Sequence, residues 1–121
     1  MDSSELKSGL NDLKLRLIDI REGVFDVTSK ENRLKKIEDD LAKEEVWSDL
    51  ELSQKISKEK TALEKSLISF KSVEEKVSDG LMFIDIAVAE GDEASINEII
   101  ESFNEIEKSV SELEFSKMFT N

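Results

Sequence analysis

The sequence predicts an all-α fold: an antiparallel helical bundle, coiled-coil-like, of about four helices with one long central helix. Apolar residues recur at steps of three and four along nearly the whole chain, which is the period of one helix face, and no strand-like alternation persists. The 121 residues contain no Pro and only four Gly, so few residues would interrupt a helix. This length favours a single domain over residues 1–121.

The long central helix is predicted over residues 49–90. Gly80 follows Asp79, and Asp-Gly is a turn signal, but the apolar pattern keeps its register across this point, so we predict a continuous helix. The apolar residues of this helix form a line along one face, called its stripe below, which an isolated helix cannot bury. We therefore expect residues 1–46 and 92–119 to pack against it. The stripe residues are Leu63, Leu67, Phe70, Val77, Leu81, Ile84 and Val88. Between Phe70 and Val77 one position of the stripe is occupied by Glu74, and the apolar Val73 precedes it.

A first helix is predicted over residues 3–22, with Asp2 and Glu5 as its N-terminal cap and Gly23 at its end. Its stripe is Leu6, Leu10, Leu13, Leu17, Ile20 and Val24. A last helix is predicted over residues 92–119, where Gly91 ends the long helix in a left-handed conformation and Asp92 caps the next one. Such a short link requires antiparallel packing. The stripe of this last helix is Ile96, Ile99, Phe103, Ile106, Val110 and Leu113.

Phe115, Met118 and Phe119 leave the stripe of the last helix. Two interpretations remain open for them: they pack on something that follows in a longer protein, or they close the end of the bundle.

A second helix is predicted over residues 29–43, with Thr28 and Glu31 as a capping box and a short stripe of Leu34, Ile37 and Leu41. The corner after it contains the single Trp of the chain. Ser48 and Glu51 form a second predicted capping box, and Trp47 and Leu52 have the spacing of a hydrophobic staple. We therefore predict a structural role for Trp47; a binding hot spot is the alternative.

The residue types exclude several kinds of chemistry. Without His or Cys, the chain has no imidazole proton relay, no His-ligated zinc site, no disulfide and no thiol nucleophile. No glycine-rich phosphate loop and no cluster of metal ligands is evident. Asp39 and Asp40, like Glu74 and Glu75, are adjacent on a helix and point about 100° apart, so we interpret them as solvated surface charges. The sequence thus predicts no catalytic, cofactor or metal site, and a protein that is not an enzyme.

The net charge of −12 indicates the kind of partner. Residues 91–121 contribute half of this excess, with eight acidic and two basic residues. An acidic chain gains nothing from neutralising phosphates, so basic protein surfaces are better partners than nucleic acid. We hypothesise that the last helix, with Glu98, Glu101 and Glu105, contributes to such a contact. No apolar run reaches the roughly 18 residues of a membrane span, and no signal peptide is apparent, so we expect a cytoplasmic protein without a membrane partner.

Five segments resemble, in the same order, the N-terminal domain of bacterial peptide chain release factor two, a class I translation termination factor. They are residues 26–34, 45–49, 58–64, 87–93 and 113–119. The corner Val46-Trp47 and the ending Leu113-Glu114-Phe115 with Met118-Phe119 are the most specific of them. The family usually has Pro shortly before the Val-Trp corner, where this chain has Glu44, so the geometry of the corner is expected to differ.

The resemblance implies an accessory domain in stop-codon-dependent translation termination on the ribosome. In that family the codon-reading loop and the catalytic Gly-Gly-Gln loop belong to other domains, which are absent from this chain, so no catalytic residue can be assigned here. The resemblance further implies contacts with the stalk base of the large ribosomal subunit (proteins and rRNA), with the remaining domains of the factor, and with the partner GTPase that recycles it. The alternative is a free-standing helical adaptor or coiled-coil dimerisation module.

Overall fold

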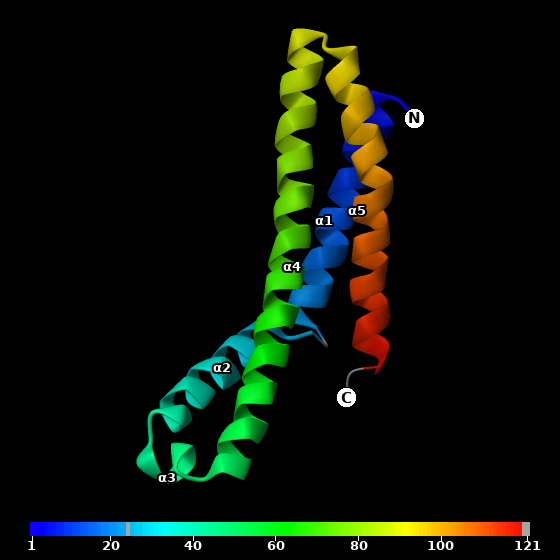
Figure 1. Ribbon diagram of the computed structural model, residues 1–121. Helices are drawn as coiled ribbons and strands as arrows, with labels where there is room; N and C mark the ends of the chain where they lie inside the picture. The colour runs from blue at the N-terminus through cyan, green and yellow to red at the C-terminus, as the bar shows by residue number, and fades with distance from the viewer. Residues whose placement is uncertain (24, 120–121) are drawn as a thin grey trace. The chain divides into compact units, whose positions relative to one another are not determined.

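The computed structural model describes residues 1–23 and 25–119, with side chains up to Phe115, and confirms the all-α fold. Five helices follow one another along the described chain: α1 (Ser3–Glu22), α2 (Val27–Leu41), α3 (Glu44–Trp47), the long α4 (Leu50–Glu90) and α5 (Glu93–Phe119) (Figure 1). The four predicted helices agree with α1, α2, α4 and α5 to within two residues at each end, and α4 continues through Gly80 as predicted. The short helix α3 was not predicted.

The chain divides into two compact units, and the division falls within α4. Unit 1 consists of Met1–Phe25 and Lys71–Asn121, and unit 2 of Asp26–Phe70. Unit 1 therefore contains α1, the second part of α4 and α5, whereas unit 2 contains α2, α3 and the first part of α4. The single domain over residues 1–121 stays a prediction.

In unit 1, α1 runs antiparallel to α4. The Lys7 Nζ lies 2.8 Å from Asp85 Oδ1, and the Arg21 Nη1 lies 3.0 Å from Glu74 Oε1, so rising residue numbers on α1 meet falling numbers on α4. The two-residue link between α4 and α5 turns the chain back, and α5 therefore runs parallel to α1, as Figure 1 shows. Three helices thus surround one apolar core in this unit.

The predicted stripes of α1 and α5 form this core. Every described member of the α1 stripe is buried, and Val24 lies outside the described residues. On α5, the middle residues Phe103, Ile106 and Val110 are buried, and the residues at both ends of the stripe are half-buried. These two helices follow the sequence pattern because each interface position has a large aliphatic or aromatic side chain.

The stripe of α4 was wrong at its C-terminal end. Val88 is 50% exposed, whereas Ala87 is buried, and seven positions earlier Gly80 is buried while Leu81 is only half-buried. The physical reason is close approach between helices. A Cβ atom on Gly80 would lie 3.2 Å from Leu10 Cδ2, so the absence of a side chain there leaves room for α1.

Gly9 serves the same purpose between α1 and α5. A Cβ at this position would lie 2.7 Å from Cζ of Phe103, closer than packed carbon atoms approach one another. We expect Gly9→Ala to destabilise the chain by about 1–3 kcal/mol through overpacking, although Ala is the better helix former by about 1 kcal/mol. Urea unfolding followed by circular dichroism would measure this; an unchanged or higher midpoint would show that the ring moves aside without penalty.

Four predicted helix ends are confirmed, two on α1 and two at the link between α4 and α5. The Glu5 N–H donates to the Asp2 carboxylate at 2.8 Å, and Gly23 is the C-cap of α1. After α4, Gly91 has φ +64, and the Asp92 N–H donates to the Ala87 carbonyl at 2.9 Å, the six-residue closure of a Schellman motif. The Ser95 N–H donates to the Asp92 carboxylate at 3.1 Å, which caps α5. The turn between α4 and α5 is therefore determined by Gly91, Asp92 and their neighbours in the sequence.

The two predicted capping boxes were wrong. Helix α2 begins two residues earlier, because Asp26 in the left-handed region (φ 46) accepts the Ser29 N–H at 3.0 Å. Helix α4 begins one residue later, because Asp49 accepts the Leu52 N–H at 3.1 Å. Aspartate caps a helix as well as Ser or Thr does, and its negative charge also interacts favourably with the helix dipole. In both places an Asp near the predicted cap takes its role.

The hydrophobic staple at Trp47 was also wrong. With Asp49 as the cap, the staple positions fall on Ser48 and Ser53 instead of Trp47 and Leu52. Residues 44–47 form α3, in which Val46 is buried, so the neighbouring Trp47 points outward and is 58% exposed. Phe115 is likewise exposed, and the side chains of Met118 and Phe119 lie outside the described residues, so the two interpretations of that ending stay predictions.

Because Trp47 is mostly exposed, its removal is expected to have only a small effect on the stability of the chain. We expect Trp47→Ala to change the free energy of unfolding by less than about 1 kcal/mol, because a mostly solvated side chain leaves no cavity. Val46→Ala, one residue away, is the control and should lower the denaturation midpoint more, since Val46 is buried. A midpoint for Trp47→Ala below that of Val46→Ala would mean that the indole is buried in solution.

Candidate protein-binding surface

One carboxylate of each adjacent pair singled out from the sequence takes part in a surface ion pair. Asp40 accepts a hydrogen bond from Lys43 at 3.3 Å within unit 2. Glu74 accepts two from the Arg21 guanidinium, both at 3.0 Å, and so links α4 to α1 in unit 1. Asp40 and Glu74 thus each have a cation as a partner, which supports their interpretation as surface charges. Among the described residues no group of three or more metal-ligating side chains converges.

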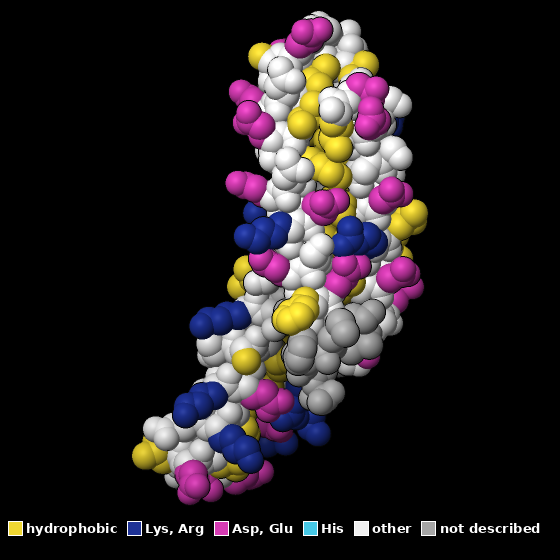
Figure 2. All heavy atoms as spheres, turned by 90° about the vertical axis from the view of Figure 1, so that its right-hand side faces the viewer, with side chains coloured by type: hydrophobic (Ala, Val, Ile, Leu, Met, Phe, Trp, Pro, Cys, Tyr) yellow, Lys and Arg dark blue, Asp and Glu magenta, His cyan; other side chains and the backbone are white. Residues whose placement is uncertain are grey.

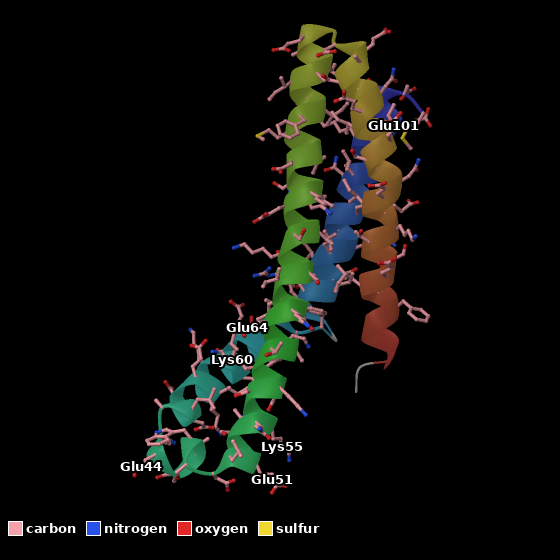
Figure 3. All side chains as sticks on the ribbon, in the orientation of Figure 1. Glu44, Glu51, Lys55, Lys60, Glu64 and Glu101 are labelled. Atoms are coloured by element: carbon pink, nitrogen blue, oxygen red, sulfur yellow. The ribbon has the colours of Figure 1, made fainter. Side chains whose placement is uncertain are left out.

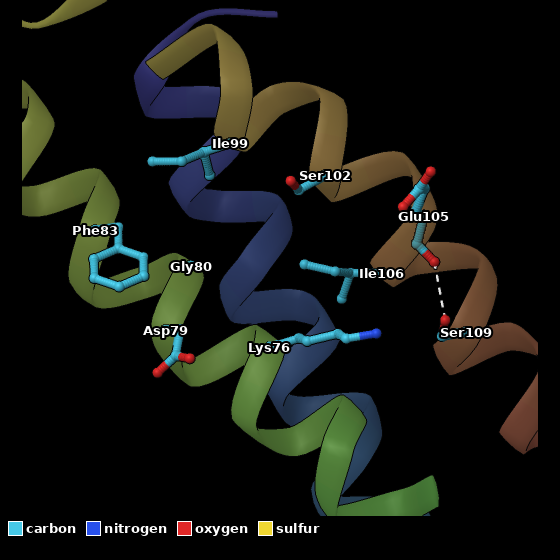
Figure 4. A pocket seen from close by; sticks show the side chains of 9 residues that line it. All are labelled: Lys76, Asp79, Gly80, Phe83, Ile99, Ser102, Glu105, Ile106 and Ser109. Carbon is cyan, nitrogen blue, oxygen red and sulfur yellow. Dashed lines mark hydrogen bonds between the residues drawn. The ribbon is translucent and has the colours of Figure 1, made fainter. Parts of the chain in front are cut away.

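A groove lies between α4 and α5 in unit 1. Its first section has a volume of about 330 Å³. Phe83 of α4 and Ile99 and Ile106 of α5 project into the space between the two helices, with α1 behind (Figure 4). Gly80 also lines this section. The floor is thus apolar, although the groove lies open on the surface.

A second section, of about 260 Å³, extends the groove toward the link between the helices. It shares Phe83 and Ile99 with the first section and adds Ile86 and Ala87. Phe83 and Ile86 are 49% and 48% exposed, so about half of each side chain is in contact with water. The sequence interpretation missed both residues because they lie off the stripe. The sequence feature that could have indicated them is the high proportion of apolar residues in 81–88, which is more than a single buried helix face requires.

The rim of the groove is acidic. It carries one basic side chain, Lys76, against five carboxylates, and none of the five forms an ion pair with a described residue. The space-filling view shows Asp and Glu side chains bordering exposed hydrophobic ones near the end of unit 1 at which α4 and α5 are linked (Figure 2). The five rim carboxylates are Asp79, Glu90, Asp92, Glu98 and Glu105. An apolar floor between negative edges is complementary to an apolar ligand with positive flanks.

The three glutamates proposed from the sequence for a partner contact are all exposed on α5, but they do not act as one group. Glu98 and Glu105 are seven positions apart and line the groove, whereas Glu101 does not (Figures 3 and 4). Seven residues complete nearly two helical turns, so the first two share a face. The structure therefore places two of the three on the groove rim.

Ion pairs fix the helices that form each unit. In unit 1, the Arg16 guanidinium of α1 donates from Nε to Glu114 Oε2 at 3.1 Å and also contacts Ser111 of α5. In unit 2, Arg33 of α2 makes two parallel hydrogen bonds with Glu59 of α4, at 2.7 and 2.8 Å. These bonds hold the pKa of Glu59 below its usual value. Paired, oriented charges of this kind are structural rather than catalytic.

The two aspartate caps give the stability a predictable pH dependence. Hydrogen bonds from the Ser29 hydroxyl and N–H lower the pKa of Asp26, and those from Ser95 do the same for Asp92. Because the folded state favours the ionised form, the stabilisation is complete above the ordinary pKa of 3.8 and is lost as the pH falls through the lowered value. Asp26→Asn with Asp92→Asn keeps both caps but removes their titration.

We therefore expect this double variant to lose thermal stability less steeply than the unsubstituted chain between about pH 5 and pH 2. Melting temperatures across that range, measured by circular dichroism, would test it. Parallel melting curves for the two proteins would contradict the cap assignment.

Comparison with known proteins adds the context for this surface. No family model matches the chain. Peptide chain release factor 2 of Xanthomonas euvesicatoria is 28% identical over 120 residues, covering 99% of this chain and 32% of the relative. The corresponding protein of Campylobacter fetus is 35% identical over 120 residues with the same coverage, and that of Buchnera aphidicola is 29% identical over 121 residues. The chain spans about a third of the length of the curated relatives it matches.

The helical fold and these matches define a chain related to part of a translation termination factor. That part is the N-terminal third of peptide chain release factor 2, to which the chain is homologous over nearly its whole length. The resemblance inferred from short segments is therefore confirmed. The part of the chain that the structure describes includes no helix long and apolar enough to cross a membrane.

Proposed function

We propose that this chain is the N-terminal accessory domain of a peptide chain release factor that acts in stop-codon-dependent translation termination in the cytoplasm. One observation carries the proposal: the homology to peptide chain release factor 2 extends over 99–100% of the chain at 28–35% identity. A free-standing helical adaptor would share the fold, but it would have no reason to share the order of residues over this whole length.

The proposed role is docking rather than catalysis. The domain would contact the stalk base of the large ribosomal subunit, both proteins and rRNA, and would influence the GTPase that recycles the factor. The acidic α5 supports contacts with basic proteins, since residues 92–114 include eight acidic residues and a single lysine. The absence of His and Cys, and carboxylates that pair with Arg and Lys, support a domain without chemistry of its own.

A chimera tests the proposed identity. The chain replaces the N-terminal third of peptide chain release factor 2 from Campylobacter fetus, and peptide release from ribosomes at a stop codon is measured with and without the partner GTPase. We expect the chimera to support release and to respond to the GTPase. A chimera that behaves like the factor without its N-terminal third would contradict the proposal, and a stable dimer of the chain in sedimentation would favour the coiled-coil alternative.

Co-sedimentation with ribosomes tests the proposed contact of α5. Replacing Glu98, Glu101 and Glu105 with Gln should weaken binding of the chain and reduce its salt dependence. The matched control replaces Glu44, Glu51 and Glu64, three exposed carboxylates of unit 2, and should bind as before (Figure 3). Equal binding by both triple variants would show that α5 makes no charged contact.

A further inference from the structure

We infer that the groove between α4 and α5 is a binding site for a basic amphipathic helix of a partner protein. The inference goes beyond the proposed function, because it assigns a site to named residues and a chemistry to the ligand, and it does not require that the partner be ribosomal. The groove joins two cavities along one line, with an apolar floor and an acidic rim.

The floor has the composition that an apolar helix face requires. Phe83 and Ile86 of α4 face Ile99 and Ile106 of α5, and each of the first two is about half exposed. A side chain of this size that is left half in water gains about 1 kcal/mol or more when a ligand covers it. Phe83 and Ile86 therefore offer an apolar surface on which the anchor residues of a bound amphipathic helix, spaced three or four positions apart, can pack.

The length of the groove selects a helix over a small molecule. On α4 the lining residues extend from Lys76 to Glu90, which corresponds to roughly 21 Å at the rise of an α-helix. A ligand helix of about 14 residues, or four turns, would cover this distance. The two cavities also remain open to the surface along their length, as the exposure of Phe83 and Ile86 shows.

The rim determines the charge of the ligand. The five rim carboxylates, with Lys76 as the one cation among them, give a local excess of four negative charges. Glu98 and Glu105 are exposed on one edge, and Asp79 and Glu90 on the other, so a bound helix would meet negative charge on both sides. Lys and Arg residues flanking its apolar face would neutralise these charges.

The same charge argues against the other occupants. Phosphates of nucleic acid or of an anionic membrane would be repelled by the rim. A second copy of this chain has a net charge of −12 and, in a symmetric dimer, would place an identical acidic rim against the first. A basic protein segment is the one class of ligand that both the floor and the rim favour.

Titration calorimetry of the 121-residue chain with a synthetic peptide tests the inference. The probe is an amphipathic peptide of about 14 residues, with Leu and Ile on one helical face and Lys beside it. We expect saturable binding with one peptide per chain. A scrambled peptide of the same composition should bind at least about ten-fold more weakly, because it cannot present an apolar face; equal binding of both peptides would reduce the contact to charge alone and overturn the inference.

Matched variants locate the site. Ile86→Asp should weaken peptide binding by at least about ten-fold, whereas Leu15→Asp, an exposed apolar residue of α1 away from the groove, should leave it unchanged. Glu98→Gln with Glu105→Gln should weaken it by about five-fold, and Glu101→Gln with Glu112→Gln, on the same helix outside the groove, should not. Circular dichroism confirms that each variant is folded.

Three results with the chain and its variants would also overturn the inference: unchanged binding by Ile86→Asp, an equal loss in Leu15→Asp, or a dimer of the chain that Ile86→Asp disrupts. The last result would identify a second copy as the occupant. No ribosome is present in this experiment, so its failure is distinct from a failure of ribosome binding or of the chimera.

Discussion

Phe103→Ala should destabilise the chain by about 3–5 kcal/mol, the largest loss that we expect from a single substitution on α5. The ring is 6% exposed and packs over Gly9, which has no side chain of its own to fill the cavity that removal of the ring would leave. The free energy of unfolding from equilibrium urea titration measures this loss. Phe115→Ala is the control on the same helix, and we expect a loss of less than about 1 kcal/mol because that ring is mostly exposed.

The packing of Phe103 on Gly9 also predicts coupling between the two positions. Gly9→Ala should destabilise the unsubstituted chain, but in the Phe103→Ala background the clash is absent and the added methyl group should be neutral or stabilising. Additive effects of the two substitutions would contradict this contact. So would equal stabilities of Phe103→Ala and Phe115→Ala, because burial is what distinguishes the two rings.

Much of the helical fold was predictable because each helix has its own periodic pattern and its own ends. Leu6, Leu10 and Leu13 are large and evenly spaced, so period alone identified the buried face of α1. The link at Gly91 and Asp92 was predictable because the left-handed glycine and the capping carboxylate act locally. Those features depend on neighbours in the sequence and not on the packing of distant segments.

The register of α4 was not predictable in the same way. Its interface uses Gly80 and Ala87, where a search for large apolar side chains selects Leu81 and Val88. The choice depends on how closely α1 approaches, which is a property of the assembled unit and not of the α4 sequence. Phe83 and Ile86 were missed for a separate reason, because they lie off the stripe in the predicted register and in the observed one.

The corner at Trp47 was mispredicted because two local signals competed. Ser48 and Asp49 can each cap α4, and the choice between them determines which residues occupy the staple positions. Asp49 is the cap, so Val46 is buried and the indole is exposed. Aspartate at the start of a helix combines a hydrogen-bond acceptor with a negative charge that interacts favourably with the helix dipole. The spacing of residues alone does not show this advantage of Asp49 over Ser48.

The 121-residue chain alone should release no peptide from ribosomes stalled at a stop codon. Hydrolysis of the peptidyl ester requires a positioned water and donors that stabilise a developing oxyanion. The sequence contains no Gly-Gly-Gln segment, the motif that catalyses release elsewhere in peptide chain release factor 2.

Release of labelled peptide from stop-codon complexes measures this prediction, with peptide chain release factor 2 of Campylobacter fetus as the positive control. We expect the chain to give the background rate at every concentration, and an excess of it to inhibit the factor if both occupy the same ribosomal surface. The Glu98, Glu101 and Glu105 to Gln variant should inhibit less, since it lacks the proposed charged contact. Stop-codon-dependent release by the chain alone would contradict its assignment as an accessory domain.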